Sequence, residues 1–315
     1  MGTGAEVWPA NAASIRRTAA LVRAGGLVAF PTETVYGLGV NALDEAAVLR
    51  LFRAKGRPAT NPVIVHVADA TDVHQVADEW PESARILAAK FWPGPLTLVL
   101  PKAASVPAAA TAGGPTVAVR CPAHPVALAL LREAGVPIAA PSANRSGELS
   151  PTTAAHVVQS LGDRIDAVLD GGPCSVGIES TVLDVTGQSP HILRPGPITG
   201  PMIETIIGPI TGGRISDGPA RSPGQSPRHY APRTAVELAE NLIEAEAIRR
   251  ALERAGFRVH FLTFPDQPDR AAAELYARLH ALDDGSWDRI VIVLPPDRPE
   301  WAAVRDRIIR SAAEQ

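Results

Sequence analysis

The chain has 315 residues, of which 46% are hydrophobic and 20% charged, with a net charge of −3 and a pI near 6.3. This composition allows packed cores, suggests two domains, and argues against a protein that coats nucleic acid or an anionic membrane. Cys121 and Cys174 are far apart and outside any C-x-x-C pattern, which argues against a disulfide framework or a thiolate zinc site. No leader-like segment and no run of eighteen apolar residues occurs, so we expect a cytoplasmic protein.

Short apolar runs alternate with helix-like segments from residue 14 to about residue 200, which indicates an α/β sheet with crossover helices. We expect strands at 27–30, 63–67, 96–100, 116–120, 137–140, 167–169, 181–185 and 191–193. We expect helices at 14–24, 44–54, 82–90, 124–134 and 152–161. Ser150 followed by Pro151 is typical of a helix N-cap with proline at the first helical position.

The composition changes after Arg194. Residues 195–232 are rich in proline and glycine, so we interpret them as a linker or lid that cannot bury a core of its own. A smaller α/β unit follows, with a helix expected at 236–255, a strand at 257–264, a helix at 271–282, a strand at 289–294 and a last helix from about 300. We therefore expect a first domain at 1–207, a linker or lid at 208–233 and a C-terminal domain at 234–315.

Common nucleotide-binding and hydrolase motifs do not explain the chain. "GLGVNA" at 37–42 fits a G-x-G-x-x-A pattern, but "TETVY" separates it from the preceding strand, and the position expected for an acidic residue falls in a basic turn. Neither G-x-x-x-x-G-K-[ST] nor G-x-S-x-G occurs. A nucleotide would have to bind without a P-loop.

Basic and small polar residues stand at the ends of the expected elements. Lys55 is one of three lysines and lies two residues before Arg57 in "KGRPATNPVIVHV", which fits either a solvated turn or an anion site. Arg120 ends a buried strand and needs an anionic partner, which a structural salt bridge would also supply. His66, alone in a strand, is more often a hydrogen-bonded core residue than a ligand.

The segment "PSANRSGELSPTT" at 141–153 places hydroxyl and amide side chains before a helix N-terminus, where phosphate oxygens bind well, although turns use the same residues. Taken together, the strand-end residues predict a cationic pocket on a slightly acidic protein. Its expected members are Lys55, Arg57, Arg120, Ser142, Asn144 and Arg194.

A series of motifs resembles the YrdC/Sua5 family of L-threonylcarbamoyladenylate synthases. Over residues 8–207 they occur in the family's order as "FPTETVYGLG", "KGRPATNPVIVHV", "FWPGPLTLVLP", "TVAVRCPAHP", "PIAAPSANRSGELSPT", "DGGPCSVGIESTVLD" and "LRPGPIT". The later "SPG" and "HYAP" resemble the interdomain linker of the longer, two-domain Sua5 type. Residues 234–315 fit that type's Rossmann-like C-terminal domain in length and pattern, though their sequence is less diagnostic.

The resemblance implies a YrdC-like twisted mixed sheet with flanking helices, and a nucleotidyltransferase that joins L-threonine, bicarbonate and ATP and releases pyrophosphate. The product would feed threonylcarbamoylation of tRNA next to the anticodon through a downstream transferase complex. Mg²⁺ is implied with ATP, with no dedicated protein ligands expected. We expect a monomer that does not bind membranes, and direct tRNA binding stays open.

The resemblance also assigns site residues. Lys55 and Arg57 would be catalytic, supplying a compact charge and a planar fork for bicarbonate and phosphate oxygens. Threonine contacts would be Thr34, His66, Arg120, Ser142 and Ser180. Nucleotide contacts would be Arg57, Asn61, Thr116, Asn144, Ser150, Arg194 and Tyr230.

Two other functions fit parts of the sequence. A carbamoyltransferase-type module would make carbamoyladenylate from carbamoyl phosphate, but such proteins carry extra zinc-finger or transferase domains for which this chain lacks the cysteines and the length. A non-catalytic RNA-binding module would need an excess of phosphate-facing basic residues and would bind with a steep salt dependence.

Overall fold

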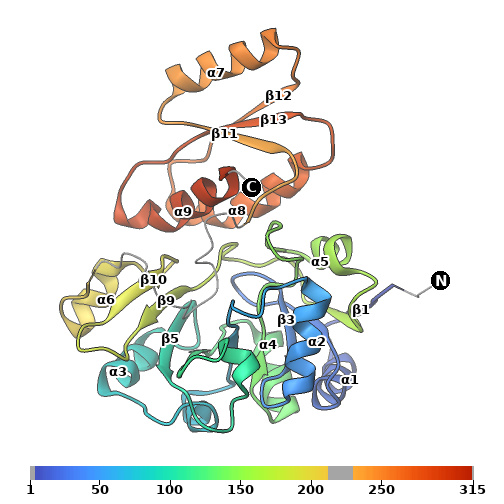
Figure 1. Ribbon diagram of the computed structural model, residues 1–315, viewed down its shortest axis with the longest axis vertical. Coiled ribbons are helices and arrows are strands. Elements are labelled where there is room, and N and C mark those ends of the chain that lie inside the picture. Colours follow the sequence, from blue (N-terminus) through green and yellow to red (C-terminus); the bar gives the residue numbers. More distant parts are fainter. Residues whose placement is uncertain (1–3, 212–229, 314–315) are drawn as a thin grey trace.

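A computed structural model describes residues 4–211 and 230–313, which build two α/β domains around separate sheets (Figure 1). The larger sheet is mixed and its ten strands lie in the order β1-β8-β2-β3-β7-β4-β6-β5-β9-β10. These strands are β1 (Glu6–Pro9), β2 (Val28–Phe30), β3 (Gly37–Asn41), β4 (Ile64–His66), β5 (Leu96–Pro101), β6 (Thr116–Arg120), β7 (Ile138–Ala139), β8 (Ala167–Asp170), β9 (Thr181–Asp184) and β10 (His191–Arg194).

Helices cover both faces of the larger sheet because successive strand residues point to opposite sides. In β2, Ala29 joins the core cluster that α2 and α3 cover, whereas Val28 and Phe30 join the cluster that α1 and α4 cover. The helices of this domain are α1 (Ala12–Arg23), α2 (Glu45–Lys55), α3 (Glu82–Phe91), α4 (Pro125–Ala134), α5 (Ala154–Leu161) and α6 (Gly200–Ile207), with 3-10 helices η1 (Ala70–Gln75) and η2 (Ala108–Thr111).

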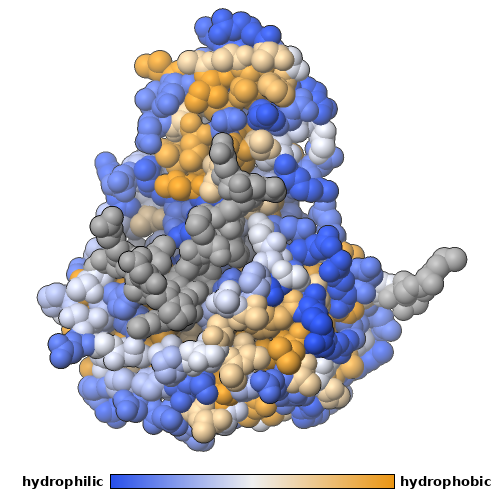
Figure 2. All heavy atoms as spheres, in the orientation of Figure 1, coloured by the Kyte–Doolittle hydropathy of each residue, from blue (hydrophilic) through white to orange (hydrophobic). Residues whose placement is uncertain are grey.

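The C-terminal domain has three layers. Its parallel sheet has the order β11-β13-β12, formed by β11 (Ala235–Ala239), β12 (Val259–Leu262) and β13 (Arg289–Val293). Helix α7 (Leu242–Arg254) covers the face away from the larger domain, while α8 (Pro268–Leu282) and α9 (Ala302–Ala312), which follows η3 (Pro299–Trp301), lie between the small sheet and the larger domain (Figure 1). Apolar residues remain visible on one face of this thin domain (Figure 2).

The two domains share a hydrophobic core. Val35, Leu149 and Ile178 of the larger domain are buried in one cluster with Leu275 and Tyr276 of α8. Burial of this kind contributes roughly 25 cal/mol per Å² of apolar surface, so the contact stabilises a fixed arrangement of the two domains. The C-terminal domain is therefore docked on the larger domain rather than tethered beside it.

The expected α/β architecture with a smaller second α/β domain is confirmed. Each of the eight strands expected before residue 195 is present within a few residues of its expected bounds. Strands β1 and β3 were not expected. The glycines of β3 hid it, although Gly39 is required there, since a Cβ on it would lie 2.7 Å from the Phe30 ring and 2.8 Å from Ile138.

Three other predictions are wrong in detail. The expected helix at 236–255 begins as strand β11, in which Val236 and Leu238 face the shared core and Ala239 the opposite side, and α7 starts only after the N-cap Asn241. Helix α6 lies in the stretch interpreted as linker, because its buried Ile203 packs into the main core. Ser150 does not cap α5, since Thr153 accepts the capping hydrogen bond from the amide of His156.

Candidate active site

A polar pocket lies where several loops leave the larger sheet, next to the C-terminal domain. The parallel pair β4–β6 places His66 directly beside Arg120, and β10 brings Arg194 to the same region. Tyr230, the first described residue after 211, lies against it with its ring buried. The lining residues are Thr32, Thr34, Val35, Gly37, Arg57, Ile64, His66, Arg120, Ala140, Pro141, Ser142, Glu179, Arg194 and Tyr230.

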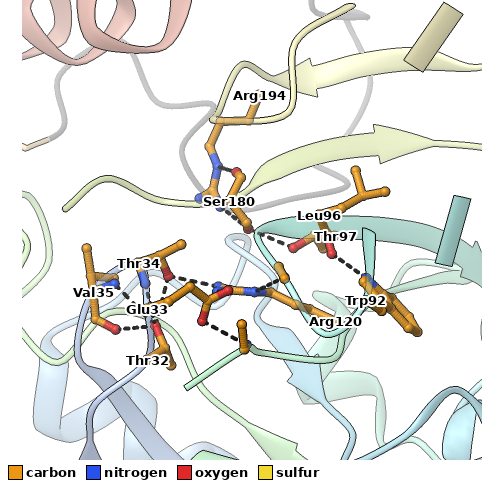
Figure 3. A network of polar contacts seen from close by, with 12 residues as sticks. Thr32, Glu33, Thr34, Val35, Trp92, Leu96, Thr97, Arg120, Ser180 and Arg194 are labelled. Carbon is orange, nitrogen blue, oxygen red and sulfur yellow. Dashed lines mark hydrogen bonds and ion pairs between the residues drawn. The ribbon is translucent and has the colours of Figure 1, made fainter. Parts of the chain in front are cut away.

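Arg120 is held by a buried ion pair. Its Nη2 donates to Glu33 Oε1 at 2.6 Å and its Nη1 donates to Thr34 Oγ1 at 2.9 Å (Figure 3). Glu33 also accepts from the amide of Ala123 at 3.0 Å. The sequence left open whether a structural salt bridge or a ligand would pair with Arg120; the structure supplies Glu33 as the salt-bridge partner. A guanidinium has five N–H donors, so donors remain for a second anion.

Arg194 and Ser180 form a second group next to the Arg120 network (Figure 3). The Arg194 Nε and Nη2 donate to the carbonyl and the Oγ of Ser180, both at 3.1 Å. Ser180 Oγ is also 2.7 Å from Thr97 Oγ1. Ser180 is thus a buried support for Arg194 rather than a lining residue.

Lys55 and Arg57 have different structural roles, although they are only two residues apart. Arg57 borders the pocket, and its Nε and Nη2 donate to the carbonyl and side-chain oxygens of Asn61 at 2.9 and 2.6 Å. Lys55 is the last residue of α2, and its Nζ donates to the carbonyls of Ser142 and Asn144, so it fixes the loop after β7. Burial, with the positive charge of Arg57, lowers the pKa of Lys55 well below its usual value.

His66 lines the pocket in its neutral form. Burial lowers its pKa to about 3, and the charge of Arg120 acts in the same direction. Its Nδ1 is buried and has no hydrogen-bond partner among the described residues. That atom can therefore exchange a hydrogen bond with a ligand without first breaking one inside the protein.

The low pKa of His66 predicts a pH-dependent stability. The unfolded chain binds a proton near pH 6.5 and the folded protein only near pH 3, so the free energy of unfolding should decrease as the pH falls from 6.5 to 5. His66→Gln should reduce that slope by about 1 kcal/mol per pH unit in urea unfolding. The exposed His74→Gln serves as control, and equal slopes in the two variants would contradict the assignment.

The structure brings together seven of the sequence-predicted site residues in the lining of the pocket. They are Thr34, Arg57, His66, Arg120, Ser142, Arg194 and Tyr230. Four more form hydrogen bonds to lining residues from behind, namely Lys55, Asn61, Ser150 and Ser180. Asn144 does not, and its carbonyl accepts from Lys55 instead. Thr116 is at the opposite end of β6 from Arg120 and does not border the pocket. "SPG" at 222–224 and most of the expected lid lie outside the described residues.

Two acidic residues of the site were missed. Glu33 pairs with Arg120, and Glu179, which lines the pocket, accepts from Ser150 Oγ at 2.5 Å. Each adjoins a residue that was singled out, Thr34 or Ser180, but only the folded arrangement identifies the distant partner.

Within 4–211 and 230–313, no cluster of three His, Cys, Asp or Glu side chains could hold a metal. In the same parts of the chain, no helix is long and apolar enough to cross a membrane.

Fold and pocket together define a two-domain α/β protein whose pocket is bordered by three arginines. The profile described as "Telomere recombination" (Sua5_yciO_yrdC) matches residues 20–196, and that of the "Threonylcarbamoyl-AMP synthase, C-terminal domain" matches residues 198–313. The chain is 42% identical to a threonylcarbamoyl-AMP synthase of Bacillus subtilis, covering 96% of this chain and 94% of that one. It is 51% identical to another from Pyrococcus abyssi, covering 76% and 71%.

A solved structure of P. abyssi Sua5 complexed with L-threonine has a TM-score of 0.91 and 40% identity, and the match covers 97% of each chain. The chain belongs to the YrdC/Sua5 family, in its two-domain Sua5 form. It is a threonylcarbamoyl-AMP synthase, a nucleotidyltransferase of threonylcarbamoyladenosine formation in tRNA. The carbamoyltransferase and RNA-binding alternatives are set aside.

Proposed function

We propose that the pocket binds L-threonine, bicarbonate and ATP together and forms threonylcarbamoyladenylate. The amine of threonine condenses with bicarbonate to a carbamate and releases water. A carbamate oxygen then attacks the α-phosphate, and the bond to the leaving pyrophosphate breaks. The observation that carries the proposal is that three arginines, at positions 57, 120 and 194, border one buried pocket in a protein of net charge −3.

This reaction needs positioning and charge stabilisation more than covalent help from the protein. Arg120 would bind the threonine carboxylate through the N–H groups that Glu33 and Thr34 leave available, near His66 and Ser142. Arg57 and Arg194 would neutralise phosphate oxygens, while Asn61 and Ser180 keep these guanidinium groups in place. Lys55 would shape the loop of Ser142 and Asn144, and in this proposal its contribution to catalysis is through that loop.

The remaining assignments complete the proposal. Tyr230 and Ser150 would border the nucleotide. Thr116 matches a nucleotide contact of the family pattern, but it does not line the pocket. Mg²⁺ would arrive with ATP on its phosphates, since the nearest carboxylates, Glu33 and Glu179, are already paired with arginines.

We keep a catalytic domain of 1–207, a connection of 208–233 and a C-terminal domain of 234–315, which agree with the end of α6 and the start of β11. We also propose that the protein is a monomer and that a downstream tRNA-modifying complex uses its product.

The direct test is a turnover assay with ATP, Mg²⁺, bicarbonate and threonine, with the adenylate detected by mass spectrometry. Pyrophosphate release should require both threonine and bicarbonate. Carbamoyl phosphate should not replace them. Pyrophosphate release that is indifferent to threonine would contradict the proposed use of the pocket.

Selectivity for threonine should depend on its hydroxyl. Thr34 and His66 offer polar atoms in the pocket, and a site that hydrogen-bonds a hydroxyl rejects an isostere without one far more strongly than an apolar pocket can. Serine, which lacks only a methyl group, should be penalised by about 1–2 kcal/mol. In competition assays valine should therefore inhibit much less than serine; equal inhibition would contradict hydroxyl recognition.

A further inference from the structure

A buried carboxylate joins the pocket to the C-terminal domain. Glu179, from the loop before β9, lines the pocket and accepts hydrogen bonds from both domains. Ser150 Oγ donates at 2.5 Å from the larger domain. From the C-terminal domain, Tyr276 OH donates at 3.1 Å and Arg307 Nε at 2.8 Å.

Arg307 is the largest fully buried side chain among the described residues. Its guanidinium pairs with Glu179 and with Asp306, the latter at 2.7 Å through Nη1, and lies 5.2 Å from the centre of the Tyr230 ring. Its Nη2 has no hydrogen-bond partner among the described residues. Burying an ion pair with one unsatisfied donor gives little net stability, so stability alone does not account for an arginine here.

The pocket explains why Glu179 needs a dedicated cation. The carboxylate lies in the same lining as Arg57 and Arg194, the two groups assigned to phosphate oxygens. An uncompensated carboxylate at this place would attract those guanidinium groups and repel the triphosphate. Burial favours the neutral form of Glu179, but Arg307 first and Arg194 second outweigh it and lower its pKa to about 2, so that the group is charged at neutral pH.

We propose that Arg307 is a positioning residue for the nucleotide half of the pocket, supplied by the C-terminal domain. It neutralises Glu179, so that this carboxylate holds Ser150 and Tyr276 instead of competing with ATP for Arg194 and Arg57. Tyr230 belongs to the same group, since its ring centre is 5.2 Å from the Arg307 guanidinium and 5.9 Å from the centre of the Tyr276 ring. The inference rests on the proposed function, because it requires that ATP bind on the side of the pocket formed by Arg57, Arg194 and Glu179.

The test compares three variants by steady-state kinetics. Arg307→Met removes the charge and keeps a long buried side chain, and it should raise the KM for ATP about tenfold while the KM for threonine changes less than twofold. Glu179→Gln removes the competing charge and keeps an oxygen to accept from Ser150, so the KM for ATP should rise less than in Arg307→Met. In the double variant, Glu179→Gln should restore most of the ATP affinity lost in Arg307→Met.

A pH series gives a readout that a purely structural role would not change. In Arg307→Met the pKa of Glu179 should rise, because the variant removes the largest of the contacts that lower it while burial still favours the neutral form. The KM for ATP of this variant should therefore fall toward the wild-type value as the pH is lowered from 8 to 5.5. Wild type should show no corresponding trend.

The matched control is Arg305→Met on the same helix, whose partners Pro295 and Asp297 both belong to the C-terminal domain. It should leave both KM values unchanged. Two results would overturn the inference: a KM for ATP in the double variant that is no lower than in Arg307→Met, or a tenfold higher KM for ATP in Glu179→Gln. The second comparison can still be made if Arg307→Met does not fold. An unchanged KM for ATP in Arg57→Ala would instead contradict the proposed nucleotide site itself.

Discussion

Replacing Arg120 with alanine is expected to weaken threonine binding by about 2–4 kcal/mol, which is the range for removing one member of a buried charge pair. The effect on ATP binding should be smaller, because Arg120 lies beside His66 and Glu33 on the side assigned to the amino acid. Isothermal titration calorimetry with each ligand measures both losses. Equal losses for threonine and ATP would show that Arg120 acts only as a structural ion pair.

Glu33 complicates this experiment and also provides its control. In Arg120→Ala the Glu33 carboxylate stays buried, and among the described residues only the Ala123 amide still donates to it, so the variant should also unfold more easily. Adding Glu33→Gln removes the stranded charge and should recover stability without recovering threonine binding. Recovery of both would assign the loss to misfolding of the pocket.

Replacing Arg57 with alanine should raise the KM for ATP roughly 100-fold, equivalent to about 2.7 kcal/mol. The guanidinium borders the pocket, where its two hydrogen bonds to Asn61 orient it. Steady-state kinetics at saturating threonine measures this change. Arg53→Ala, on the exposed side of α2, is the control and should behave as wild type. A KM for ATP within threefold of wild type in Arg57→Ala would remove Arg57 from the nucleotide site.

The sequence was most informative where local pattern and tertiary environment agree. Strand β6 has the expected bounds because Val117 and Val119 face one side of a buried sheet and Ala118 the other, and the same alternation places Arg120 on the side of Ala118. Strand β3 could not be predicted, because glycine is unfavourable in an isolated strand and the neighbour that requires it, Phe30, is supplied by the fold. Likewise, residues 236–239 are compatible with helix until the parallel partner β13 is present.

The basic half of the site could be predicted and the acidic half could not. Lys55, Arg57, Arg120 and Arg194 stand at strand or helix ends, which a pattern can locate. The partners of Glu33 and Glu179 are 87 and 128 residues away in the sequence, and no periodicity connects them. The role of Ser150 changed for the same reason, since its hydroxyl binds Glu179 rather than the first turn of α5.

The hydrophobic core shared by the two domains restricts how this protein can be recombined with its relatives. Val35, Leu149 and Ile178 pack against α8, and the next residue, Glu179, pairs with α9. A chimera that exchanges the C-terminal domain at the linker would leave these four residues facing side chains selected in another background. Domain exchange should therefore be planned around this contact surface, with the four residues taken from the same parent as α8 and α9. For such an exchange, the residues of this contact surface matter more than the position of the covalent boundary near residue 208.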